Sequence, residues 1–118
     1  MVKVVMVVDD SATIRQEVAA VLGPEGFKIV EAADGEEALG KLDSEVALVL
    51  CDVNMPRMNG LDFLDQLKAR KISVPVLMLT TEGQPDSIER AKLAGAKGWI
   101  IKPFKAPQLI AAVKQVAR

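Results

Sequence analysis

The sequence predicts an α/β fold, a doubly wound five-stranded parallel sheet in the order 2-1-3-4-5 with helices on both faces. Strand-like apolar runs alternate with helical patterns along all 118 residues, as expected of βαβ units. Three runs are almost continuously apolar, which suits central strands, and the other two suit the edges. Half of the residues are apolar, enough for the core of one domain spanning residues 1–118.

The first strand is predicted at Val4–Val8, a continuous apolar run of the kind found in strands buried on both faces. Ser11 follows it and can cap a helix over Ala12–Leu22, because its side-chain oxygen can accept a hydrogen bond from the first helical turn. Two glycines and a proline within residues 23–26 end this helix.

The next elements are an edge strand, a short helix and a second central strand. Phe27–Ala32 alternates apolar and polar residues, which is typical of an edge strand. Asp34-Gly35 forms a turn into a short helix that ends near Leu42. Val46–Cys51 is again almost entirely apolar and is therefore expected in the centre of the sheet.

The middle of the chain is predicted to contain a loop, a helix and the third central strand. The loop covers Val53–Asn59, and the helix covers Gly60–Ala69. Leucines at positions 61, 64 and 67 recur at helical spacing and should face the core. Val74–Leu79 is the apolar run that follows.

The last elements are two helices flanking a short strand. Pro85 suits the first turn of a fourth helix that runs to Ala94. Gly98–Ile101 is the last and shortest strand, which places it at the second edge. Pro107 begins a final helix that continues to the C-terminus and has apolar residues 109, 110 and 113 on one face.

Composition excludes several classes of protein. Lys plus Arg number 15 against 16 for Asp plus Glu, so the net charge of -1 offers no footprint for direct binding to nucleic acid or to an anionic membrane. No apolar stretch approaches the length of a membrane span. The single cysteine, Cys51, lies in an apolar run and cannot form an intrachain disulfide, which favours a cytoplasmic location.

Four apolar runs end on polar side chains that carry chemistry: Asp9 and Asp10, Asp52, Thr80 and Lys102. Since ligands of open parallel sheets bind outside the carboxyl ends of the strands, these side chains are expected to converge. Two carboxylates about 5 Å apart repel by roughly 3 kcal/mol at an effective dielectric near 20. The cluster therefore requires counterions, and Mg²⁺ with its preference for carboxylate and carbonyl oxygens fits best. Lys102 supplies a second positive charge.

One carboxylate of such a cluster can act as a nucleophile toward phosphorus while the cations neutralise the transferred group. Asp52 stands alone on its strand between Lys102 and Thr80, which makes it the best candidate for an aspartyl phosphate. Each residue taken alone has a simpler interpretation: Asp10 as a helix cap, Lys102 as a solvated side chain, Thr80 as a strand end. Their joint occurrence on different strands favours the functional interpretation.

The chain resembles the receiver domains of two-component response regulators, most closely the stand-alone chemotaxis (CheY-like) type, over essentially its whole length. The resemblance rests on Asp9-Asp10, on Asp52-Val53-Asn54-Met55-Pro56 followed by Asn59-Gly60, on Thr80, and on Lys102-Pro103-Phe104, in the family's order and spacing. The family's fold is the flavodoxin-like fold predicted above.

The resemblance implies that Asp52 receives a phosphoryl group from a phosphohistidine on a partner histidine kinase. It implies that Asp10 and Asp52 bind Mg²⁺ directly with the backbone carbonyl of Asn54, and that Asp9 acts through water. The absence of histidine from the chain is consistent with a phosphoryl acceptor. The chain would then be a signalling protein with no enzymatic turnover beyond its own phosphorylation and dephosphorylation.

The resemblance also implies a switch. Lys102 would pair with the phosphoryl oxygens, and its bond to Pro103 is expected to be cis. The hydroxyl of Thr80 would move to the phosphoryl group while Trp99, where the family usually has Tyr or Phe, swings inward. This change would remodel the face formed by the fourth helix, last strand and last helix, where a downstream protein binds. The simpler interpretation of Trp99 is a half-buried packing residue at the sheet edge.

Three further residues are implied in the lifetime of the phosphorylated state. Asn54 and Glu82 match positions that orient the hydrolytic water in chemotaxis-type receivers. Thr81 stands where the family usually has Ala, Ser or Gly, and its bulk should slow access to the phosphoryl group. The two effects oppose each other, and which one dominates stays open, as does a role for Glu82 as a solvated loop charge.

Other functions are weighed against this one. Within the receivers, motility control, pilus control and a phosphorelay intermediate all remain open, and with no attached output domain the signal would pass to another protein. A Mg²⁺-dependent aspartyl-nucleophile phosphohydrolase needs a second Asp two positions after the nucleophile, where this chain has Asn54. A flavodoxin-like electron carrier needs a phosphate loop where this chain has Asp9-Asp10.

Overall fold

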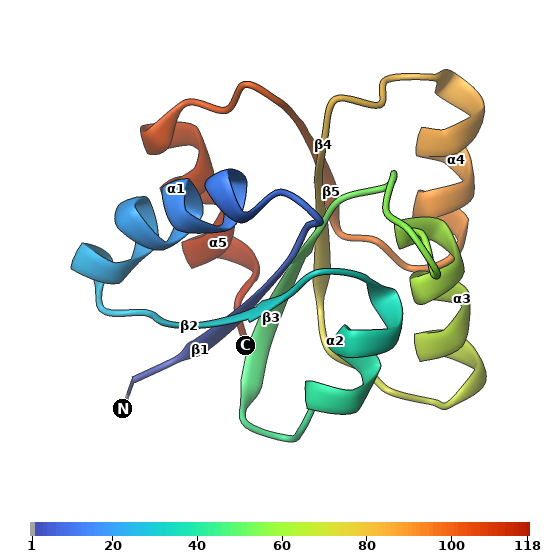
Figure 1. Ribbon diagram of the computed structural model, residues 1–118, viewed down its shortest axis with the longest axis horizontal. Helices are drawn as coiled ribbons and strands as arrows, with labels where there is room; N and C mark the ends of the chain where they lie inside the picture. The colour runs from blue at the N-terminus through green and yellow to red at the C-terminus, as the bar shows by residue number, and fades with distance from the viewer. Residues whose placement is uncertain (1) are drawn as a thin grey trace.

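The computed structural model describes residues 2–118 as five parallel strands with helices on both faces of the sheet (Figure 1). The strand order is β2-β1-β3-β4-β5, so the predicted topology and both edge strands are confirmed. The elements are β1 Val4–Val8, α1 Ala12–Leu22, β2 Lys28–Ala32, α2 Gly35–Lys41, β3 Val46–Cys51, α3 Gly60–Ala69, β4 Val76–Thr80, α4 Pro85–Leu93, β5 Gly98–Ile101 and α5 Ala106–Val116.

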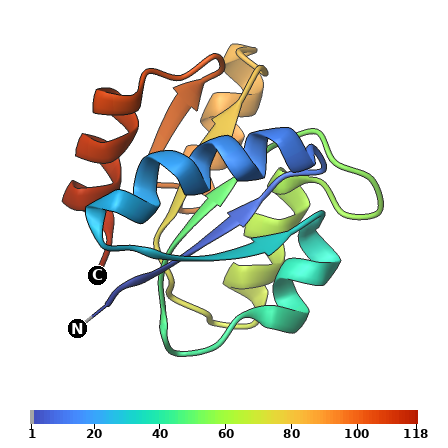
Figure 2. The ribbon, with the colours of Figure 1, turned by 60° about the vertical axis from the view of Figure 1, so that its left-hand side comes forward.

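The sheet separates two apolar cores. Helices α1 and α5 cover one face, and α2, α3 and α4 cover the other (Figures 1 and 2). Alternate residues of β1 enter opposite cores, with Val5 and Val7 on the α1/α5 side and Met6 and Val8 on the other side. Residues of β1, β3 and β4 are almost all buried, which explains their continuous apolar runs. Cys51 is one of them, a buried free thiol.

The differences from the predicted boundaries are small. β4 begins at Val76 instead of Val74, since Pro75 has no N–H to donate to the sheet; its carbonyl still accepts a hydrogen bond from Val49 at 2.9 Å. β2 begins at Lys28 because the N–H of Phe27 bonds back to the end of α1, at 3.4 Å from the Leu22 carbonyl. The helix boundaries agree to within one residue, except that α5 ends at Val116, two residues before the predicted end at Arg118.

Side-chain caps order the helix starts that surround the carboxyl edge of the sheet. The side chain of Ser11 accepts a hydrogen bond from Ile14 N–H at 3.3 Å, as predicted. Asp34 caps α2 and Asn59 caps α3 in the same way, each with a 2.9 Å bond. These caps fix the loops that carry the functional residues. Within residues 2–118, no helix combines the length and apolarity needed to cross a membrane.

Candidate functional site

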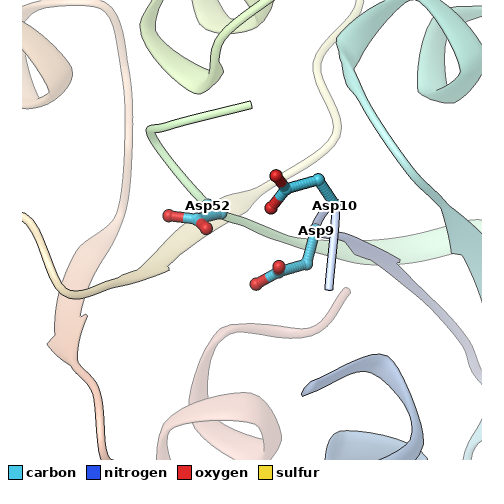
Figure 3. A group of neighbouring side chains, drawn as sticks. All are labelled: Asp9, Asp10 and Asp52. Carbon is cyan, nitrogen blue, oxygen red and sulfur yellow. The ribbon is translucent and has the colours of Figure 1, made fainter. Parts of the chain in front are cut away.

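The carboxylates of Asp9, Asp10 and Asp52 meet at the carboxyl edge of the sheet (Figure 3). One oxygen from each lies within 4.8 Å of those from the other two. The pairing of β1 with β3 causes this convergence, since Val8 stands opposite Cys51 and the next residues are Asp9 and Asp52. The hydrogen bond from the Asp52 N–H to the Val8 carbonyl, 2.9 Å long, continues the ladder into the site.

The ammonium of Lys102 bridges two of these carboxylates. Its Nζ lies 2.6 Å from Asp9 Oδ2 and 3.2 Å from Asp52 Oδ2. The side chains of Lys102, Asp9 and Asp52 are only 11%, 3% and 10% exposed, so the charges interact in a poorly solvated environment. Lys102 is the first residue after β5, and its N–H donates a hydrogen bond to the Thr80 carbonyl. The peptide bond between Lys102 and Pro103 is cis, as expected.

Burial and ion pairing act against each other on these groups. Burial raises the pKa of Asp9 above its usual value, although the hydrogen bond from Lys102 acts to lower it. Burial by itself lowers the pKa of Lys102, but the hydrogen bond to Asp9 and the charge of Asp52 outweigh it, so this pKa is raised. Lys102 is therefore charged at neutral pH and neutralises part of the cluster.

The carboxylate oxygens of Asp9 are already engaged. Oδ1 accepts a hydrogen bond from the Ser11 N–H at 2.9 Å, and Oδ2 accepts from Lys102. Asp52 is bonded at both oxygens too, since Oδ1 accepts the Val53 N–H at 2.7 Å and Oδ2 accepts from Lys102 at 3.2 Å. Asp9 differs from Asp52 in its lower exposure, 3% against 10%, and in its shorter contact with Lys102.

The donor set fits a hard divalent cation. Ligand oxygens of an octahedral Mg²⁺ lie about 3.0 to 4.2 Å apart, given metal–oxygen distances of about 2.1 Å. The three carboxylates each offer an oxygen within 4.8 Å of the other two, close enough to this range for the set to hold such a cation. Asp10 is exposed, and its side chain makes no hydrogen bond within residues 2–118. Asn54 is also exposed and lies in the loop directly after Asp52.

Gly60 lies against the backbone of Asp52. A Cβ atom at Gly60 would lie 2.0 Å from the Asp52 carbonyl oxygen, far below any allowed contact, and its N–H donates to the Val53 carbonyl at 2.8 Å. Any other residue would push α3 and the phosphoacceptor candidate apart. This requirement explains the glycine that follows the Asn59 cap.

The predicted switch residues Thr80 and Trp99 are joined through the backbone of one residue, Glu82. Thr80 is fully buried at the end of β4, and its Oγ1 accepts a hydrogen bond from the Glu82 N–H at 3.2 Å. The indole Nε1 of Trp99, which is half-buried, donates to the Glu82 carbonyl at 2.9 Å. Thr81 is exposed and lines a cavity of about 270 Å³ beside Lys102.

One residue near the site escaped the sequence interpretation. The guanidinium of Arg15 donates to the Asp9 carbonyl at 2.5 Å and pairs with Glu31 of β2 at 2.8 Å. It thereby ties α1 and β2 to the residue that Lys102 engages. Its position one turn after the Ser11 cap is a signal that could have suggested a contact with the acidic residues.

The fold and the site together define a class: α/β domains with a cluster of acidic residues at the point where the strand order of a parallel sheet reverses. The family described as response regulator receiver domain matches residues 5–114. The chain belongs to this family, and the predicted resemblance is confirmed. Receiver domains are phosphoacceptor modules of two-component signalling and are not classical enzymes.

Several relatives are similar over nearly the whole chain. The transcriptional regulatory protein PdtaR of Mycobacterium tuberculosis is 39% identical over 93% of this chain, which covers 54% of that protein. The chain thus spans about half the length of this relative. Chemotaxis protein CheY1 of Helicobacter pylori is 39% identical, with 89% of this chain and 88% of that protein covered.

Solved structures agree with the fold. Chemotaxis protein CheY4 of Vibrio cholerae has a TM-score of 0.90 and 38% identity, covering 98% of this chain and 99% of that one. The complex described as CheX-CheY-BeF3-Mg+2 from Borrelia burgdorferi has a TM-score of 0.90 and 30% identity, covering 97% of this chain and 88% of that one.

Proposed function

We propose that this chain is a phosphoacceptor response regulator in which Asp52 takes a phosphoryl group from a partner histidine kinase in a Mg²⁺-dependent reaction. The observation that carries the proposal is the contact of Lys102 with both Asp9 and Asp52, beside a third carboxylate at the strand ends. A purely structural ion pair would not require three carboxylates within 4.8 Å of one another.

In the proposed step, a carboxylate oxygen of Asp52 attacks the phosphorus of a phosphohistidine. The new P–O bond forms as the P–N bond breaks, and the imidazole of the donor leaves and takes up a proton. Lys102 lies where its ammonium can neutralise charge on the phosphoryl oxygens. Bound Mg²⁺ would supply the remaining positive charge for the same oxygens.

Four residues would hold the cation: Asp10 and Asp52 by carboxylate, Asn54 by its backbone carbonyl, and Asp9 through water. The lower exposure of Asp9 and its 2.6 Å contact with Lys102 support the indirect role of Asp9. The Mg+2 and BeF3 named for the similar Borrelia burgdorferi complex support the binding of this cation by a chain of this fold.

Phosphorylation would move the backbone of Glu82. If the Thr80 hydroxyl turns to the phosphoryl group, the Glu82 N–H loses its acceptor, and the carbonyl of the same residue is the acceptor for Trp99. Movement of the Thr80 side chain would therefore shift the hydrogen-bond acceptor of Trp99. This arrangement gives the expected coupling a physical route of two hydrogen bonds.

The proposed target surface is the face formed by α4, β5 and α5. Trp99 lines a cavity of about 270 Å³ there together with Ile88, Lys92 and Lys97, and Ile101 nearby is 47% exposed. An apolar hollow with basic residues suits a protein segment that carries both apolar and acidic side chains. The partner protein in the Borrelia burgdorferi complex supports protein binding as the output.

The lifetime of the phosphorylated state would be set by Asn54, Glu82 and Thr81. Asn54 and Thr81 are exposed and Glu82 is half-buried, so water can reach all three. Asn54 and Glu82 would orient the hydrolytic water, and Thr81 would restrict its approach.

Motility control is the preferred setting because two of the similar proteins are named as chemotaxis proteins. Pilus control and a phosphorelay remain the alternatives. In each of them residues 1–118 would act as one receiver domain whose signal passes to a separate protein. The cytoplasmic location stays a prediction.

The test is intact mass after brief incubation with Mg²⁺ and a small acyl phosphate. Wild type should gain one phosphoryl group that is lost on mild base treatment, and Asp52→Asn should gain none. Asp43→Asn, at an exposed position outside the site, is the matched control and should behave as wild type. Equal labelling of wild type and Asp52→Asn would move the nucleophile elsewhere, and no labelling of wild type would refute transfer from this donor.

A further inference from the structure

The loop between β3 and α3 is held at its base and near its far end. It spans residues 53–59 and carries Asn54, the proposed carbonyl ligand. At the base, the Gly60 N–H donates to the Val53 carbonyl at 2.8 Å. Near the far end, the Met58 N–H donates to the Pro56 carbonyl at 2.7 Å. Asn54 itself is exposed, so its position depends on how these neighbours are fixed.

The start of α2 packs against this loop. The Gly35 N–H donates to the Met58 carbonyl at 3.1 Å. A Cβ at Gly35 would lie only 2.8 Å from Cγ of Met58, so the loop packs directly on the backbone of the helix start. The two segments therefore touch without space for a side chain between them.

An ion pair reinforces this contact. Asp34 has a fully buried side chain, whose Oδ1 accepts the Glu37 N–H and whose Oδ2 accepts a hydrogen bond from Arg57. Arg57 has a positive φ of 62°, a conformation that is uncommon for a residue with a side chain. A buried carboxylate without a cation is strongly unfavourable, so the ion pair with Asp34 stabilises Arg57 in this position.

We infer that the Asp34–Arg57 pair positions the cation site: it holds the loop of residues 53–59 so that the Asn54 carbonyl is already aimed at Mg²⁺. This inference rests on the proposed function. Mg²⁺ demands near-ideal octahedral geometry, which makes its binding sensitive to small displacements of a ligand. Neither Asp34 nor Arg57 is itself a ligand, and both act through the loop backbone.

The test is calorimetric titration of Mg²⁺ into wild type, Arg57→Gln, Asp34→Asn and the double variant. Each single variant should bind about tenfold more weakly, at the lower end of the range for residues that orient metal ligands. The double variant should bind no more weakly than either single variant, because both remove the same contact. Lys114→Gln breaks the 2.7 Å ion pair with Glu25, remote from the loop, and should bind as wild type.

The two single variants differ in their risk to folding. Arg57→Gln leaves Asp34 buried without its cation, whereas Asp34→Asn removes the charge and keeps a residue that can cap α2. Arg57→Lys, which retains the positive charge, should recover part of the affinity. At saturating Mg²⁺ the phosphorylation rate of the folded variants should return to within about twofold of wild type, since no reacting group is changed.

Equal Mg²⁺ affinity of wild type and Asp34→Asn would overturn the inference and leave the proposed function intact. A similar loss of affinity in Lys114→Gln would also overturn it, because the effect would then be general. If wild type binds no Mg²⁺, the proposed function and this inference fail together, and that result is distinct from the first two.

Discussion

Replacement of Lys102 by methionine should destabilise the cation-free protein. The Nζ lies 2.6 Å from Asp9 and 3.2 Å from Asp52, which at an effective dielectric of about 20 corresponds to attractions of about 6 and 5 kcal/mol. The desolvation of these nearly buried groups offsets most of that energy. Removing one partner of such a pair leaves uncompensated charge, and we expect the free energy of unfolding to fall by about 3 kcal/mol.

Mg²⁺ should reverse part of this loss. Without Lys102, carboxylate oxygens within 4.8 Å repel by about 3.5 kcal/mol or more per pair, less for Asp10 because it is exposed and screened. A divalent cation relieves this repulsion, and in the variant it no longer competes with the Lys102 ammonium for the carboxylates. At ten times its dissociation constant Mg²⁺ should stabilise wild type by about 1.4 kcal/mol, and the same concentration should stabilise the variant more.

The assay is urea unfolding followed by circular dichroism, in EDTA and in Mg²⁺. Lys3→Met is the matched control, since Lys3 is exposed and lies outside the site, and its stability should stay within about 0.5 kcal/mol of wild type. Equal stability of wild type and Lys102→Met in EDTA would refute the electrostatic reasoning. So would a stability difference that is the same with and without Mg²⁺.

Three further predictions concern single contacts. Gly60→Ala should lower both stability and Mg²⁺ affinity, since the added Cβ would lie 2.0 Å from the Asp52 carbonyl oxygen. The control Gly40→Ala, whose added Cβ meets nothing within 4 Å, should leave both unchanged or raise stability. Equal melting temperatures of Gly60→Ala and wild type would contradict the prediction. Trp99→Phe should lower the free energy of unfolding by about 1 kcal/mol in urea titrations, through loss of the indole hydrogen bond, and no change would mean that this bond contributes nothing. The hydrogen bond from the Glu37 N–H and the Arg57 guanidinium lower the pKa of Asp34 below its ordinary 3.8, so the stabilising contribution of the Asp34 carboxylate is complete above pH 3.8 and is lost as the pH falls through the folded-state pKa. The melting temperature of Asp34→Asn should lack this part of the dependence on acid pH, and a pH profile identical to that of wild type would contradict the prediction.

The local pattern of the sequence determined most of the architecture. Continuous apolar runs predict strands that are buried on both faces, and the alternation with helical segments predicts a parallel sheet. The convergence of Asp9, Asp10 and Asp52 follows from the same reasoning, because carboxyl ends of parallel strands share one edge. The small errors occurred at the starts of two strands and at the end of the last helix, where hydrogen bonding and not hydropathy sets the boundary, as at Pro75.

The contacts of the site were decided by tertiary structure. Lys102 could have faced solvent, and only the packing of β5 and the loop after it brings the ammonium to Asp9 and Asp52. Strand order predicts that the carboxylates share one edge of the sheet, but it does not reveal which of their oxygens already hold hydrogen bonds.

The contact of Arg57 with Asp34 illustrates the same limit, since 23 positions separate the two residues and both lie in loops. Periodicity predicts which face of an element is buried, because burial repeats with the geometry of the backbone. Contacts between loops depend on strand register, caps and individual rotamers, which no repeating pattern encodes. The sequence by itself therefore determined the fold and the set of candidate residues at the carboxyl edge of the sheet, and the tertiary structure decided which atoms of those residues touch.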